Sequence, residues 1–162
     1  MSMTRTGSAK VELPSDTEIL ITREFDAPAE LVFEVWTNPD HVRNWWTSPE
    51  DNWLVCDIDL REGGQWRYVV ESPVHGVFGW HGEYRSIERP HRMVSTEVFE
   101  GHPDAEAIDN LTLVEVDGVT TLTVLVQHTS KENRDGHVNA GMEGGLQLAL
   151  NRVDEILEGL QS

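Results

Sequence analysis

The sequence predicts an α+β fold, in which a curved antiparallel sheet of about six to seven strands wraps around a long C-terminal helix, with two short helices after the first strand. Three observations support this. Runs of β-type residues separated by short turns fill the middle of the chain, two short helical patterns precede them, and the longest helical pattern ends the sequence. Strands linked by hairpins form an antiparallel sheet whose apolar face and edges need cover. Because only the last helix is long enough to lie across that sheet, we expect a space between the two.

The chain begins with one strand and two short helices. Residues 17–25 have β-type composition with partial alternation, which predicts a strand. The turn Asp26-Ala27-Pro28 follows, where Asp can cap a helix and Pro suits its first turn. We therefore expect helices over 29–37 and 40–46, divided by the helix-breaking pair Asn38-Pro39.

Turn residues divide the middle of the chain into strands. Asp117-Gly118, between two β-rich runs, is a strong hairpin signal. Residues 100–110 are acidic and polar, which predicts either a long loop or a mobile flap near the mouth of the space under the helix. Strands are expected over 53–60, 65–71, 77–87, 92–99, 111–116 and 119–129.

The last helix is expected over residues 137–160, where apolar and small residues recur on one helical face. Its first half contains Gly141, Gly144 and Gly145, each of which costs about 1 kcal/mol relative to Ala inside a helix. This cost has two explanations. The glycines allow either tight packing of the helix on the sheet or a cavity under the helix with room for a guest molecule.

Length and composition limit the class of protein. A chain of 162 residues suits one domain with a real core, so we expect a disordered arm over 1–16 and a single domain over 17–162. The formal net charge of −17 repels phosphate backbones, and we expect no nucleic-acid partner. No apolar run approaches the roughly 18 residues of a membrane span, and the N-terminus lacks the apolar core of a signal peptide. With a single cysteine, Cys56, expected to be a buried inert thiol, these features favour a cytoplasmic protein without membrane insertion.

Motifs for catalysis, metal or cofactor binding are missing from the sequence. It contains no G-x-S-x-G, no H-E-x-x-H, no C-x-x-C and no phosphate-binding loop. Its many carboxylates suggest no particular acid–base pair. We therefore expect no catalytic residue, no metal site and no cofactor.

Four segments resemble the START-like (SRPBCC) superfamily, in the branch of homologues of the heat-shock-protein-90 ATPase activator. The run from Asp26-Ala27-Pro28 to Trp45-Trp46 is similar to the opening of these domains. The segment 59–66 is similar to their "d.r.GG.w" pattern, 82–90 to "G.y.ei.pP.rl", and 141–153 to the helix start "GmeeGw...L.rL". The resemblance covers about residues 17–160 and implies a helix-grip fold with a hydrophobic cavity under the C-terminal helix. Leu146 stands where the family often has Trp, which should enlarge the cavity or change its shape.

Strand alternation indicates which side chains face that cavity. Trp66 and Tyr68 share one face of their strand, and Val126 and His128 share the more apolar face of the last strand. His81 is also expected on an interior strand. Plain core packing is the alternative for each of these positions. The predicted ligand-binding residues are Trp46, Trp66, Tyr68, Trp80, Val126, His128, Met142, Leu146 and Leu150.

The leading hypothesis is the binding of a small hydrophobic or aromatic molecule between the sheet and the last helix. One alternative is an interaction protein that binds a chaperone, another regulator or a second copy of itself. The other is an enzyme of the cyclase, dehydratase or hydrolase type, which would need a polar pair in the cavity, such as His128 with a carboxylate.

Overall fold

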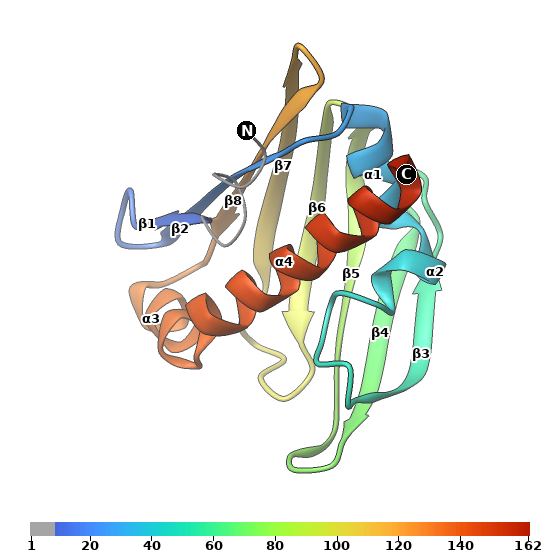
Figure 1. Cartoon of the computed structure of the whole chain (residues 1–162). Helices are drawn as coiled ribbons and strands as arrows, with labels where there is room; N and C mark the ends of the chain where they lie inside the picture. The colour runs from blue at the N-terminus through green and yellow to red at the C-terminus, as the bar shows by residue number, and fades with distance from the viewer. Residues whose placement is uncertain (1–8) are drawn as a thin grey trace.

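A curved antiparallel sheet of eight strands, in the order β1-β2-β8-β7-β6-β5-β4-β3, forms the body of the molecule. The computed structural model describes residues 9–162 (Figure 1). The predicted α+β helix-grip fold is confirmed, and its eight strands exceed the upper end of the expected six to seven by one. The strands are β1 (Lys10–Glu12), β2 (Glu18–Phe25), β3 (Asn52–Ile58), β4 (Gln65–Ser72), β5 (Gly76–Glu88), β6 (Arg92–Phe99), β7 (Ala107–Val116) and β8 (Val119–Gln127).

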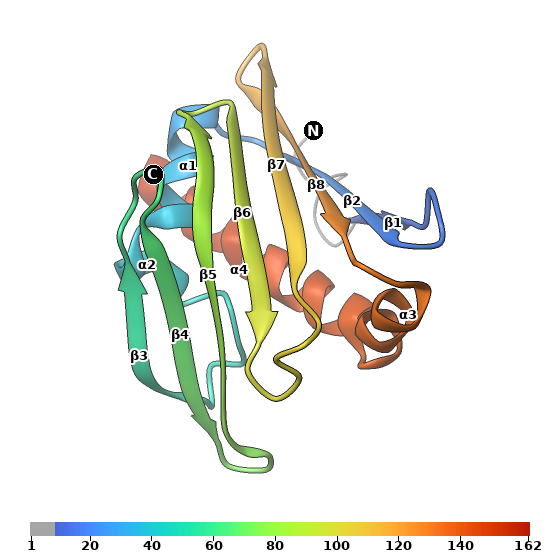
Figure 2. The same ribbon diagram turned by 180° about the vertical axis from the view of Figure 1, so that it is seen from behind.

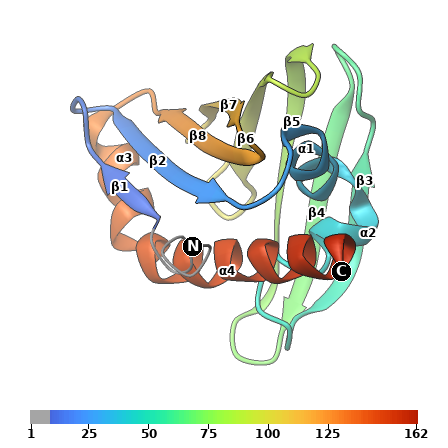
Figure 3. The same ribbon diagram turned by 45° about the horizontal axis from the view of Figure 1, so that its top comes forward.

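Helix α4 lies across the concave face of this sheet, and none of the helices among residues 9–162 covers the opposite face of the sheet (Figure 2). Figure 3 shows the strands arching over α4, with β1 and β2 toward one end of the helix and β3 and β4 toward the other. The helices are α1 (Ala29–Thr37), α2 (Pro39–Val42), α3 (Lys131–Asn139) and α4 (Met142–Gln161). Among residues 9–162, no helix has the length and apolarity that crossing a membrane would require.

The expectation of one continuous helix over 137–160 is wrong at its start. The chain forms α3 first, capped by the hydroxyl of Ser130, which accepts a hydrogen bond from Asn133 N–H. It then turns at Gly141, whose φ of +80° lies in the left-handed region that favours glycine, and α4 begins at Met142. Gly141 is therefore explained by the backbone turn between two helices. His137, expected at the start of the long helix, lies on α3 instead.

Other boundaries also differ from the prediction, and three of these differences change an expected element. Strand β1, at Lys10–Glu12, pairs with β2 inside the segment expected to be a disordered arm, so that expectation is wrong for these residues; residues 1–8 of the arm lie outside the described part. Helix α2 ends at Val42, earlier than the expected residue 46. Strand β7 starts at Ala107, so the segment 100–110 is a short loop followed by strand.

A buried ion pair connects α4 to the sheet. The side chain of Arg23, on β2, has no exposed surface, and its Nη2 lies 3.8 Å from Asp154 Oδ2 on α4. Its Nη1 also donates a 3.0 Å hydrogen bond to Asn151 Oδ1. Burial lowers the pKa of Arg23, and the charge of Asp154 opposes that shift. The pair fixes the helix over the strands, because breaking a buried pair leaves an uncompensated charge.

Candidate ligand-binding cavity

A cavity of about 540 Å³ lies between the inner face of the sheet and helix α4. This volume is in the range of ligand pockets, roughly 300–1,000 Å³. Eight of the nine predicted ligand-binding residues line it: Trp46, Trp66, Tyr68, Trp80, Val126, Met142, Leu146 and Leu150. The sequence therefore located the cavity wall on both the sheet and the helix.

The cavity wall formed by β4, β5 and the chain after α2 is aromatic. Trp46 is at its centre, with ring centroids 5.0 Å from Tyr68, 5.7 Å from Trp80 and 6.1 Å from Trp66. These distances and the steep angles between the rings are typical of edge-to-face packing. The neighbouring Trp45 is buried, and its Nε1 donates a 2.9 Å hydrogen bond to Val35 O. We call Trp46, Trp66, Tyr68 and Trp80 the aromatic end.

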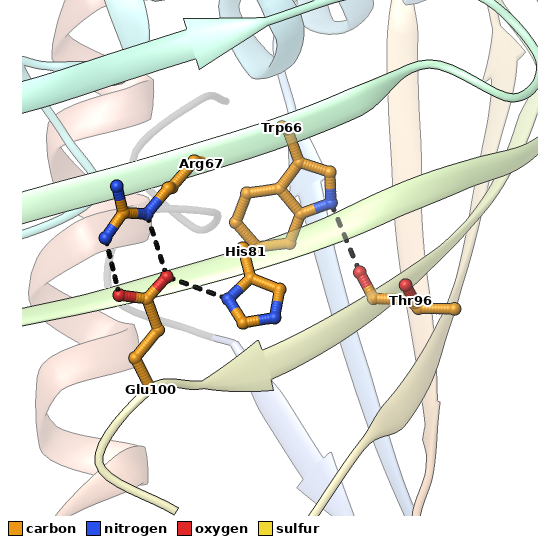
Figure 4. A network of polar contacts seen from close by, with 5 residues as sticks. All are labelled: Trp66, Arg67, His81, Thr96 and Glu100. Atoms are coloured by element: carbon orange, nitrogen blue, oxygen red, sulfur yellow. Dashed lines mark hydrogen bonds and ion pairs between the residues drawn. The ribbon is translucent and has the colours of Figure 1, made fainter. Parts of the chain in front are cut away.

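A glycine lets Trp66 reach across β5 to β6. Its Nε1 donates a 3.2 Å hydrogen bond to the carbonyl of Thr96, as Figure 4 shows. The path lies over Gly82, where an added Cβ would collide with both Thr96 O and Trp66 Nε1. The ladder between β5 and β6 is interrupted here, and Glu83 N–H donates instead to the Thr96 hydroxyl. Gly82 thus allows one buried indole to span three strands.

The wall formed by β6 and β7 carries polar side chains that the sequence did not single out. Ser95 and Glu97 lie on β6, Asp109 lies opposite Ser95 on β7, and all three line the cavity. Asp109 Oδ1 is buried and has no hydrogen-bond partner among residues 9–162, while the remaining exposed area of Asp109 borders the cavity. Burial raises the pKa of Asp109 well above its ordinary value. The nearby Glu97 adds to this rise, first through its charge and then through its carboxyl group as a hydrogen-bonding neighbour.

His137 of α3 reaches the cavity above this wall. Its Nδ1 lies 3.0 Å from Nε2 of His128, and burial lowers the pKa of both imidazoles. His128 itself does not line the cavity, so its prediction as a lining residue is wrong. Strand β8 ends at Gln127, and of the two contacting imidazoles only that of His137 lines the cavity. We call Ser95, Glu97, Asp109 and His137 the polar end.

The cavity opens at a rim formed by exposed residues of α4 and the loop before β3. Ser48, Pro49, Gly145 and Leu148 are exposed and also line the cavity. A Cβ added at Gly144 or Gly145 would meet open space, so tight packing on the sheet does not explain these two glycines. Gly145 leaves part of the entrance clear.

A family model described as Activator of Hsp90 ATPase homolog 1-like protein matches residues 26–158, most of the chain. The chain belongs to this family. Its membership agrees with the START-like (SRPBCC) superfamily that the motifs indicated. Proteins of this fold bind small ligands or proteins, and hydrophobic ligands are common among them. A comparison with curated proteins returns no match.

Solved structures share the fold over nearly their whole length. A protein of Rhodobacter sphaeroides has a TM-score of 0.87 and 24% identity, with 94% of this chain and 99% of that chain covered. Protein Ms6760 of Mycobacterium smegmatis has a TM-score of 0.82 and 25% identity, with 93% and 97% covered. CalU16 of Micromonospora echinospora is more distant in structure, with a TM-score of 0.61 and 26% identity over 88% of this chain and 81% of that chain.

In this member of the family, the outer face of the sheet carries a separate charged cluster. Glu100 accepts two hydrogen bonds from Arg67, of 2.9 and 3.0 Å, and its Oε2 lies 2.7 Å from His81 Nδ1 (Figure 4). The hydrogen bonds from Arg67, with the weaker effect of His81, lower the pKa of Glu100 to about 2. His81 lies on an interior strand, β5, as expected, but its side chain is exposed on the outer face, because Trp80 and not His81 points inward.

The residue types at the cavity suit an organic guest better than an ion. Across residues 9–162, no group of three or more His, Cys, Asp or Glu side chains is arranged to hold a metal ion. Cys56, half-buried on β3, has its pKa raised by burial, which disfavours the reactive thiolate. The cavity offers apolar area, aromatic rings and a few hydrogen-bonding groups at one end.

Proposed function

We propose that the protein binds a small apolar or aromatic molecule in the cavity under α4. The observation that carries this proposal is the continuous cavity of about 540 Å³, which has an aromatic wall and an open rim. Such a pocket binds by burying apolar area, while a few polar groups orient the ligand. Membership of a family in which hydrophobic ligands are common supports the same conclusion. The sequence-based expectation of a cytoplasmic protein is part of this proposal.

The expected affinity is moderate. Drug-sized ligands gain about 0.3 kcal/mol for each heavy atom. A guest of about 20 heavy atoms would then bind with roughly 6 kcal/mol, which corresponds to a Kd of tens of micromolar. Ligand titrations should therefore extend to several hundred micromolar.

Filling the cavity from α4 provides the test. Leu146 is half-buried and lines the cavity at the position where the family often has Trp, so Leu146→Trp should occupy the space without disturbing the helix. Leu160→Trp is the matched control, because Leu160 lies on the same helix, is 47% exposed and is outside the cavity lining. Binding is followed by the emission of N-phenyl-1-naphthylamine, an uncharged aromatic probe, on direct excitation.

We expect Leu146→Trp to weaken probe binding at least tenfold and Leu160→Trp to leave it unchanged. Circular dichroism and urea unfolding check that both variants fold. Equal probe binding by the wild type and Leu146→Trp would place the probe outside the cavity. A wild type that binds neither this probe nor any other apolar compound at several hundred micromolar would overturn the proposal.

Catalysis on a bound apolar substrate is the second candidate, and Asp109 is the observation that favours it. Burial raises the pKa of Asp109, so this carboxyl group holds its proton to higher pH than an exposed one, which suits a general acid. Hydrolysis of 4-nitrophenyl esters by the wild type, lost in Asp109→Asn with probe binding retained, would support this role. Equal turnover by both proteins would exclude Asp109 as the acid.

A further inference from the structure

The polar end of the cavity has acceptors for a hydrogen-bonding guest but no side-chain cation. Glu97 and Asp109 lie on the adjacent strands β6 and β7 and face the same space. Burial raises the pKa of Asp109 and the charge of Glu97 adds to this shift, as expected for two carboxyl groups in one poorly solvated space. In the part of the chain that the structure describes, Asp109 Oδ1 is left without a partner although it is buried.

The other charged and titratable groups around the cavity do not neutralise this pair. His137 and His128 form a hydrogen bond with each other, and burial lowers the pKa of both imidazoles against an opposing, weaker effect of the Glu97 charge. Among residues 9–162, Arg152 is the only Lys or Arg that lines the cavity. It lies beside the aromatic wall, where its Nη2 donates a 3.2 Å hydrogen bond to Trp45 O. Among residues 9–162, no Lys or Arg side chain therefore lines the cavity beside Glu97 and Asp109.

We propose that the cavity selects apolar ligands that carry a basic amine, with the ammonium group between Glu97 and Asp109 and the hydrocarbon or aryl part against the aromatic end. This inference rests on the proposed function and adds the chemical class of the ligand. An ammonium group has three donors and no acceptor, which suits two carboxyl groups with a free oxygen. Its positive charge supplies the missing counter-ion, and hydrogen bonds between charged partners are about twice as strong as neutral ones. A ligand carboxylate in the same place would meet like charge in a poorly solvated site.

Three probes that share a 4-phenylbutyl group test the proposal: 4-phenylbutylamine, 4-phenylbutanol and 5-phenylpentanoate. They differ only in the end group, so isothermal titration calorimetry at pH 7 measures the preference of the polar end. We expect the amine to bind about tenfold more tightly than the alcohol and the carboxylate to bind most weakly. In Glu97→Gln the amine should lose this advantage, while the affinity for the alcohol stays within about twofold.

The matched control is Glu100→Gln. Glu100 follows β6 but lies on the outer face of the sheet, where it contacts Arg67 and His81. Both variants remove one negative charge from a chain of net charge −17, so any general attraction of cations to the protein changes equally. Glu100→Gln should therefore keep the amine preference that Glu97→Gln loses.

Each outcome decides between the two proposals. If the alcohol binds the wild type as tightly as the amine, the inference is overturned and the proposed function stands. If Glu100→Gln reduces the amine preference as much as Glu97→Gln, overall charge explains the preference and the inference is overturned. If none of the three probes binds the wild type, the inference is overturned, and the titration with N-phenyl-1-naphthylamine decides the proposed function separately. The order of the three probe affinities for the wild-type protein tests the inference even if Glu97→Gln does not fold.

Discussion

The two ends of the cavity are built from neighbouring strands of the same sheet, yet they satisfy their polar groups differently. At the aromatic end, Trp66 donates its indole N–H to the Thr96 carbonyl, and Trp45 behind it donates to Val35 O. At the polar end, Asp109 Oδ1 and, just behind the wall, His128 Nδ1 are buried without hydrogen-bond partners among the described residues. The fold therefore satisfies the polar group of Trp66 but leaves a carboxyl oxygen of Asp109 without a partner among residues 9–162.

This difference distinguishes side chains that stabilise the folded protein from side chains that a ligand could bind. Burying an aromatic ring with its N–H satisfied stabilises the protein. Burying a carboxyl group with an unsatisfied oxygen costs roughly 1–3 kcal/mol. Because Asp109 and Glu97 also repel each other as charges, the polar end lowers the stability of the empty protein. We therefore expect substitutions at the two ends to change stability in opposite directions.

The largest effect is expected at the aromatic end. Trp66 is 5% exposed, and Trp66→Ala removes a buried ring and leaves Thr96 O without its donor. The free energy of unfolding should fall by about 3–5 kcal/mol. Urea unfolding followed by circular dichroism measures this loss. Val77→Ala, on an exposed side chain of β5, is the control and should change stability by less than about 0.5 kcal/mol. A loss below about 1 kcal/mol in Trp66→Ala would show that the aromatic end is not part of the stabilising core.

Gly82→Ala tests the packing of the Trp66 ring without changing Trp66 itself. The new methyl group would collide with Thr96 O and Trp66 Nε1, so the indole or the strand must move. We expect the free energy of unfolding to fall by about 1–3 kcal/mol. Gly136→Ala, on α3 where an added Cβ meets open space, is the control and should not destabilise the protein. Equal effects of the two substitutions would mean that the crossing of Trp66 over β5 imposes no steric requirement.

The aromatic end could be predicted from the sequence because its signals are local. Large aromatic side chains at alternate positions, as in Trp66 and Tyr68, indicate one buried face of a strand. Apolar residues at helical spacing did the same for Leu146 and Leu150 on α4. In these places burial, residue type and periodicity all agree, and the structure places each side chain at the cavity.

The polar end could not be predicted because its residues resemble surface residues. Asp109 is in an acidic segment that reads as a loop, although it alternates with the buried Ala107 and Leu111 once β7 is extended to residue 107. Glu97 likewise follows Met93 and Ser95 at alternate positions of β6, so all three side chains face the cavity. The break at Gly141 was missed for a related reason, since the helical pattern continues across it and only the left-handed backbone divides α3 from α4. Tertiary context decides each of these positions.

At the polar end we expect Asp109→Asn to stabilise the protein as pH rises. The folded state raises the pKa of Asp109, so the folded protein holds this proton more tightly than the unfolded chain. The wild type therefore loses stability as pH rises from about 4, the unfolded pKa, toward the raised folded pKa, by up to ~1.4 kcal/mol for each pH unit. Asparagine does not titrate, so the variant should match the wild type near pH 3–4 and exceed it increasingly above that range. Urea unfolding at a series of pH values measures the difference.

Glu100→Gln is the control of opposite sign on the outer face of the sheet. The folded state lowers the pKa of Glu100 to about 2, so its contribution is present above the unfolded pKa and is lost as pH falls toward 2. This variant should be slightly less stable than the wild type at neutral pH, and the difference should disappear in acid. If the stability of Asp109→Asn relative to wild type does not depend on pH, the buried carboxyl pair is not a source of instability.

The smallest effects are expected at the start of α4, next to the helix that carries His137. Gly144→Ala and Gly145→Ala should each raise the free energy of unfolding by about 1 kcal/mol, because Ala has the higher helix propensity and the new methyl groups meet open space. Thermal unfolding of both single variants measures this gain. Gly145 lines the cavity and Gly144 does not. A bulky side chain should therefore slow the entry of N-phenyl-1-naphthylamine in Gly145→Phe but not in Gly144→Phe. Stopped-flow measurements compare the two entry rates. Equal entry rates in the two Phe variants would place the entrance elsewhere, and a loss of stability in Gly144→Ala and Gly145→Ala would restore tight packing as the reason for the glycines.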